Sequence, residues 1–171
     1  MRIKSFMVMA MAAVALALGV CSCGSDDESE ATEEKQVPEV SVAEQVVGSY
    51  TGNEVVMVMG EESSNETKIY SFDKVADTSV DMSIPEMGMG GHMSIPALLV
   101  KDIPLKKTDN TRVGGLASYA GTVTNADGTE KGFTITSLSI LIDGNNIAVS
   151  YSLKYGNMPM SMETTFVGTK K

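Results

Sequence analysis

The chain has 171 residues, of which 43 % are hydrophobic, and its formal net charge at pH 7 is −9. This length and apolar content suffice for one domain with a buried core. The acidic balance argues against a nucleic-acid partner, because proteins that bind nucleic acids carry basic surfaces.

The first 22 residues have the pattern of a secretory signal peptide. Two positive charges, Arg2 and Lys4, precede the uncharged apolar run SFMVMAMAAVALALGV at positions 5–20. A permanent membrane-spanning helix usually needs about 20 apolar residues, so a span is the less favoured interpretation. We therefore expect residues 1–22 to be a signal peptide.

The two cysteines of the chain, Cys21 and Cys23, lie where this signal should end. A disulfide between residues i and i+2 would be strained, and two thiols without a nearby histidine are too few for a tetrahedral zinc site. The context Val20-Cys21-Ser22-Cys23 resembles a bacterial lipobox, in which a small residue precedes the lipidated cysteine. This favours Cys23 as the lipid anchor over the alternative Cys21; an ordinary signal with incidental cysteines is the remaining alternative.

Residues 23–45 form an acidic segment. Positions 24–45 hold eight acidic residues and one lysine, and they contain few large apolar side chains. Such a segment repels itself and lacks the apolar surface needed to fold, so we expect a disordered tether. Acids directly behind the cysteine also resemble surface-export signals of some Gram-negative lipoproteins. We therefore expect a lipid-anchored outer-membrane protein and, if the acids act as such a signal, one exposed on the cell surface.

From residue 46 to 171 the pattern changes to short apolar alternations separated by turn residues, which is typical of an all-β sandwich or barrel. The predicted strands lie within 46–60, 66–75, 77–84, 94–105, 112–124, 131–142, 146–156 and 158–168. Pro96 and Pro104 demote the fourth segment to an edge or bulged strand. The segment GEESSNE at 60–66, with Glu61 and Glu62, is predicted to be a turn.

Eight antiparallel strands in an up-and-down order close into a barrel without exposed edges. Such a barrel either fills its interior with side chains or holds one small ligand. No segment after residue 45 sustains helical apolar spacing over three turns. The predicted fold is therefore an all-β, eight-stranded, up-and-down antiparallel barrel.

Four pieces of this region carry a family resemblance: VVGSYTG, LLVKDIPLKK, NNIAVSYSLKYG and MPMSMETTFVGTKK. In this order they resemble the calycin-like β-barrel domain family of bacterial lipoproteins, over roughly residues 46–171. The resemblance implies the lipocalin-type meander and carries over no catalytic motif.

Methionine is unusually frequent, and several methionines recur at every second position. Met87, Met89 and Met93 surround the only histidine, His92, in MGMGGHM. Thioethers and an imidazole suit Cu(I), so a copper site is one hypothesis. The alternative is that flexible methionines pack an irregular interior or a promiscuous apolar pocket. We predict no resident cofactor.

The tentative ligand-binding residues are those expected to face the barrel interior. Alternation places Tyr151, Leu153 and Tyr155 on one face of their strand, and Met160, Met162 and Phe166 on one face of the next. They would line an apolar pocket if the barrel is open at one end, and would be core if it is filled.

No enzymatic motif accompanies these residues, since His92 lies in a glycine-rich segment without a nucleophile motif. We therefore expect a non-enzymatic, lipid-anchored protein of the cell envelope. It would bind a small apolar ligand or an envelope component, or would be a structural or interaction module without a small ligand.

Overall fold

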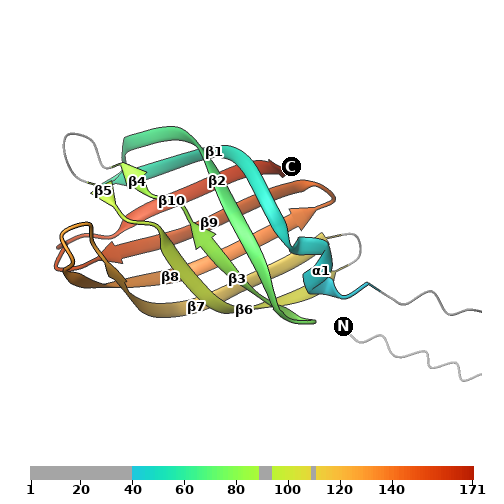
Figure 1. Ribbon diagram of the computed structural model, residues 1–171. Helices are drawn as coiled ribbons and strands as arrows, with labels where there is room; N and C mark the ends of the chain where they lie inside the picture. Colours follow the sequence, from blue (N-terminus) through green and yellow to red (C-terminus); the bar gives the residue numbers. More distant parts are fainter. Residues whose placement is uncertain (1–39, 89–93, 109–110) are drawn as a thin grey trace, which may run out of the picture. The chain divides into compact units, whose positions relative to one another are not determined.

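The computed structural model describes residues 40–88, 94–108 and 111–171, and eight of its strands form a closed antiparallel barrel (Figure 1). Each strand pairs with the next barrel strand along the chain, and the last pairs with the first. The predicted all-β, eight-stranded up-and-down barrel is confirmed. The barrel strands are β1 (Gly48–Val58), β2 (Glu61–Ala76), β3 (Ser79–Ile84), β6 (Leu98–Thr108), β7 (Thr111–Thr124), β8 (Glu130–Asp143), β9 (Asn146–Tyr155) and β10 (Met162–Lys170).

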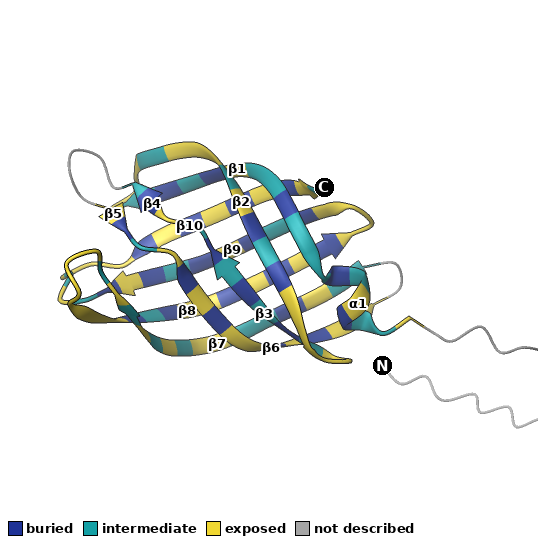
Figure 2. Ribbon diagram, in the orientation of Figure 1, coloured by how far each residue is buried: buried dark blue, intermediate teal, exposed yellow. Residues whose placement is uncertain are grey.

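Pairing of β1 with β10 closes the barrel. The register runs without a shift from Tyr50 opposite Lys170 to Val58 opposite Met162. Because successive side chains of a strand point to opposite faces, this register fixes which residues enter the interior. Figure 2 shows the result as alternating buried and exposed residues along the strands, most regularly on β9 and β10.

A short helix, α1 (Val42–Val46), packs at the barrel end where the described chain begins (Figure 1). Ser41 and Glu44 form a capping box, which satisfies free backbone N–H groups of the first turn. Ala43 and Val46 are buried, and the backbone N–H of Ala43 donates to the carbonyl of Asp77. The predicted tether boundary at residue 45 was therefore wrong, because residues 41–45 belong to the folded domain.

A two-stranded hairpin of β4 (Met87–Gly88) and β5 (Ser94–Ile95) lies at the opposite end of the barrel, between β3 and β6 (Figure 1). Met87 and Ile95 are both buried. The ammonium group of Lys68 donates to the carbonyl of Glu86 at 2.8 Å, which ties the start of β4 to β2. We call the barrel end that carries β4 and β5 the hairpin end.

Of two local predictions, the bulged alternative for the segment at 94–105 is confirmed and the turn at 60–66 is wrong. Strand β6 is bulged rather than an edge strand: its register with β3 shifts near Asp102, which has a φ of 55°, and Pro104 remains within the closed barrel. The predicted turn at 60–66 is wrong, because Met59 and Gly60 alone connect β1 to β2. Both have positive φ, as a tight two-residue hairpin requires.

A close backbone approach at the seam of the barrel gives the first testable prediction. Gly52 lies opposite Gly168, and a Cβ atom at Gly52 would come 2.0 Å from the carbonyl oxygen of Val167. Because backbone has to move to relieve this overlap, Gly52→Ala should lower the free energy of unfolding by about 1–3 kcal/mol. Chemical denaturation monitored by circular dichroism measures it.

Gly132→Ala is the matched control, since a Cβ atom there lies 3.8 Å from its nearest neighbour, the carbonyl oxygen of Gly121. This second variant should unfold at nearly the wild-type denaturant concentration. Equal destabilisation by the two substitutions would contradict the seam geometry.

Candidate functional site

Side chains from every barrel strand pack into the interior. The ring of Tyr70 stacks on Phe166 with centroids 4.1 Å apart, and Tyr50 meets Phe72 edge to face at 5.6 Å. Helix α1 lies at one end of the barrel and the β4–β5 hairpin at the other. This packing favours a barrel whose interior is filled with side chains over a barrel that is open at one end. The buried apolar side chains include Tyr50, Val56, Tyr70, Phe72, Val80, Met82, Ile84, Val100, Ile103, Leu105, Ile135, Ile140, Val149, Leu153, Met162 and Phe166.

A chain of polar contacts crosses this apolar interior. The carboxyl Oε2 of Glu54 on β1 lies 2.5 Å from the hydroxyl of Tyr70 on β2. That hydroxyl lies 2.8 Å from the hydroxyl of Tyr151 on β9, which in turn lies 3.7 Å from the sulfur of Met87 on β4. We call Glu54, Tyr70, Tyr151 and Met87 the buried chain. It connects the wall of the barrel to the hairpin.

Burial dominates the electrostatics of this chain. Only 1 % of Glu54 is exposed, and burial raises the pKa of its carboxyl group. Burial also raises the pKa of the Tyr70 and Tyr151 hydroxyls. Both phenols are therefore neutral hydrogen-bonding groups at physiological pH.

The structure separates the six residues predicted to line a ligand pocket. Tyr151, Leu153, Met162 and Phe166 are buried among the core side chains, as the filled barrel requires. Tyr155 is also buried, but it lies at the hairpin end, where β9 stops. Met160 was placed wrongly: it lies in the connection between β9 and β10 with 41 % of its surface exposed, so the strand alternation does not extend to it.

The hairpin end carries a surface hollow of about 190 Å³ around Tyr155. Its lining comes from β5, from β8, from the end of β9 and from the segment that follows β9: Ser94, Ile95, Lys131, Tyr155, Gly156, Asn157 and Met158. The ammonium of Lys131 lies 5.6 Å from the centroid of the Tyr155 ring, within cation–π distance. The Tyr155 hydroxyl donates to the side-chain oxygen of Asn125.

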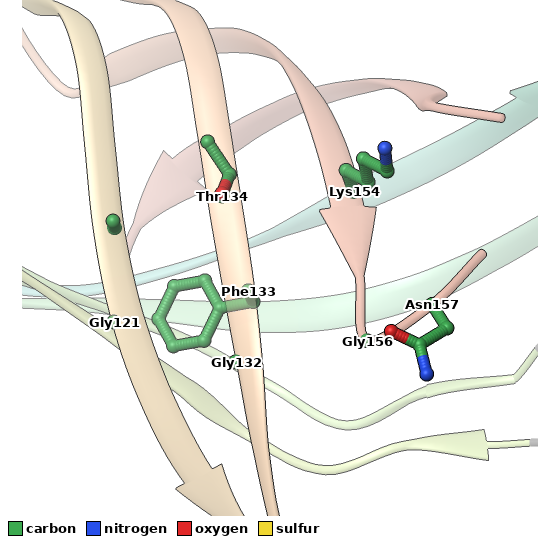
Figure 3. A pocket seen from close by; sticks show the side chains of 8 residues that line it. Gly121, Gly132, Phe133, Thr134, Lys154, Gly156 and Asn157 are labelled. Atoms are coloured by element: carbon green, nitrogen blue, oxygen red, sulfur yellow. The ribbon is translucent and has the colours of Figure 1, made fainter. Parts of the chain in front are cut away.

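A shallower hollow on the outer wall, shown in Figure 3, shares Gly156 and Asn157 with the first one. Thr134 and Lys154 border it from neighbouring positions of β8 and β9. Gly132 also lines it and has no side chain to fill the space. We call the residues Ser94, Lys131, Asn157 and Met158, with their hollows, the rim.

Met87, one of the four residues of the hypothetical copper site, is not available at the surface. Met87 points into the barrel and contacts Tyr151, away from a surface site. Met89, His92 and Met93 lie outside the described residues. Among residues 40–88, 94–108 and 111–171, no group of three or more His, Cys, Asp or Glu side chains could hold a metal ion.

Sequence reasoning missed Glu54 and Tyr70, although a signal for the first existed. Tyr50 and Val56 occupy even positions of β1 and are core residues, so Glu54 falls on the same inward face. An acid at a core position of an alternating strand is the informative exception. The rim residues Lys131 and Asn157 carried no comparable signal, because they come together only through folding.

Comparisons with known proteins agree with this architecture. The family model of the calycin-like β-barrel domain matches residues 46–169. The fold is similar to the crystal structure of a candidate outer membrane protein from Bacteroides fragilis, with a TM-score of 0.60 and 19 % identity. The alignment covers 77 % of this chain and 53 % of the other, so the chain spans about half the length of that structure. None of the curated proteins matches the sequence.

In the part of the chain that the structure describes, no helix has the length and apolar character to cross a membrane.

The buried carboxyl group predicts a specific dependence of stability on pH. Because the pKa of Glu54 is raised, the folded protein keeps a proton that the unfolded chain loses above pH about 4.3. The free energy of unfolding contributed by this group therefore falls as the pH rises from that value through the pKa of the folded state. The slope is at most about 1.4 kcal/mol per pH unit for one proton.

Urea unfolding of the wild type and Glu54→Gln between pH 4.5 and 9 measures this slope. The variant should lack the decline that the wild type shows. The lowered pKa values of Asp77 and Asp127 act in the opposite direction and at more acidic pH, so they do not mask the effect. Parallel pH profiles of the two proteins would contradict the assignment.

Proposed function

The chain belongs to the calycin-like β-barrel domain family, and from this premise we propose that it is a non-enzymatic, lipid-anchored module of the cell envelope that binds a polar envelope component through its rim. One observation carries the proposal: the barrel interior is occupied by side chains, whereas hollows open at the hairpin end. The interaction is thus a surface function of the barrel.

The anchor part of the proposal rests on the sequence. Cys23 follows a signal-like segment, and attachment of two or three acyl chains there would exceed the marginal hold of a single chain. The described chain enters the barrel at the α1 end, opposite the hairpin end. The hairpin end therefore lies away from the point where the described chain begins, and the rim lies at that end.

The chemistry of the rim favours a polar partner over a small apolar ligand. Lys131 supplies a charged donor, and Asn157 and Ser94 supply exposed hydrogen-bonding groups. The apolar contribution comes from Met158, which is partly buried, and from the covered ring of Tyr155. Small-molecule pockets are instead largely apolar and enclose most of the ligand surface.

Lipidation is tested by comparing Cys23→Ser with Cys21→Ser in the full chain expressed in its own host. The wild type and Cys21→Ser should incorporate labelled palmitate and remain with the membrane until detergent is added. Cys23→Ser should lose the label and the membrane association, because the thioether attachment point is absent. Loss of the label in Cys21→Ser instead would move the anchor to the alternative cysteine.

Binding by the rim is tested by placing a photo-crosslinking amino acid at Asn157 of the lipidated protein in intact cells. Position 157 should yield an adduct of defined mass, and Lys131→Glu should reduce its yield because it reverses the charge at the rim. Val167 is the control position, since 63 % of its surface is exposed on the outer face of β10.

Equal adducts at positions 157 and 167 would contradict rim binding. Native mass spectrometry of the protein purified from its host provides the second readout. A small apolar molecule that copurifies with the barrel, and that Lys131→Glu does not release, would favour an interior ligand instead.

A further inference from the structure

The hydrogen bonds of the buried chain run in one direction, and Met87, at the end of the chain, determines which direction that is. A thioether has no proton, so Met87 can only accept a hydrogen bond from Tyr151. A tyrosine hydroxyl has one proton, so Tyr151 must then accept from Tyr70. Tyr70 then has no proton left for Glu54, so their 2.5 Å contact forms only with the carboxyl group as the donor, the reverse of the direction in which Tyr70 donates to an ionised carboxylate. All three contacts form together only when Glu54 carries a proton.

Ionised Glu54 would reverse the chain. Tyr70 would donate to the carboxylate and Tyr151 would donate to Tyr70, which leaves no proton for the sulfur of Met87. Because a thioether is a weaker acceptor than a phenol oxygen, the contact between β9 and the hairpin is the link that is lost when Glu54 loses its proton.

The surroundings of Glu54 disfavour its charged form. Its second oxygen, Oε1, is buried and has no hydrogen-bond partner among the described residues. Leaving such an oxygen unpaired costs far more free energy when the carboxyl group is charged than when it is neutral. Phe166 on β10 lies opposite Glu54, Thr164 lies two positions along the same strand, and Tyr151 on β9 lies opposite Thr164; none of these side chains is a cation.

The charged groups near Glu54 lie on β2 and offset each other. Lys68 would favour the carboxylate and Glu66 would disfavour it. The two are joined as an ion pair at 2.7 Å, and Lys68 also donates to the carbonyl of Glu86. The ammonium group of Lys68 therefore contacts Glu66 and the carbonyl of Glu86, and not Glu54.

We propose that Glu54 is a neutral carboxylic acid in the folded protein and that its proton sets the direction of a hydrogen-bond relay that holds Met87, and with it the β4–β5 hairpin, in place. Met87 pairs with Ile95, and Ser94 and Ile95 line the hollow at the rim. Loss of the proton therefore loosens one wall of the rim. The relay is a property of the barrel itself and does not depend on which partner the rim binds.

The experiment uses the unlipidated mature chain, Cys23→Ser from residue 23 onward, with ¹³C-labelled glutamate carboxyl groups and methionine methyl groups. NMR spectra between pH 4 and 10 follow the Glu54 carboxyl and the Met87 methyl. In the wild type the two signals should shift with one midpoint, above the ordinary glutamate value of about 4.3. Glu54→Gln supplies a permanent donor, so its Met87 signal should not change with pH.

Met87→Leu separates the relay from simple burial. Leucine keeps the volume of the side chain and removes the acceptor. The Glu54 midpoint should fall in this variant, because ionisation no longer breaks a link, whereas burial alone would leave the midpoint unchanged. The proposal is overturned by a wild-type midpoint at the ordinary value, by an unchanged midpoint in Met87→Leu, or by a Met87 signal that still titrates in Glu54→Gln.

Discussion

The pairing of β1 with β10 is the constraint on which the rest of the structure depends. These two strands lie at opposite ends of the folded chain, and their nine opposed residue pairs convert a meander into a closed wall. A slip of one residue would turn Glu54 to solvent and Val55 inward, because side chains alternate along a strand. The stacking of Tyr70 on Phe166 joins β2 to β10 across β1 and depends on the observed register.

Closure also decides what kind of function the barrel can support. Once the wall is complete, the interior is accessible only through its ends, and α1 and the β4–β5 hairpin pack at these two ends. An interior ligand would have to displace Met87 or the aromatic core, which costs the packing that holds the barrel together. The rim involves no such displacement, because Lys131 and Asn157 are already exposed.

The sequence predicted the barrel because its signals are local and repeated. Alternation placed Tyr151, Leu153 and Phe166 inside, and turn residues separated the strands. Helix α1 was missed because a five-residue helix has too few turns to show periodicity, and its capping box lies within an acidic segment that is typical of a tether. The prediction for Met160 was wrong because the alternation was extended too far: β10 begins only at Met162. The rim and the buried chain join residues from distant strands, which no local pattern encodes.

Stability alone does not explain why a chain of polar side chains lies inside a filled barrel. Apolar side chains of similar volume would pack the same space without the cost of burying Glu54, and such replacements are often neutral or stabilising. Hydrogen bonds differ from apolar contacts in being directional. Met87 could rest against an apolar wall in several orientations, whereas the Tyr151 hydroxyl specifies one position for its sulfur. The buried chain thus lowers stability somewhat but fixes the position of the β4–β5 hairpin. Because Ser94 and Ile95 of this hairpin line the hollow, the position of the hairpin determines the shape of the rim.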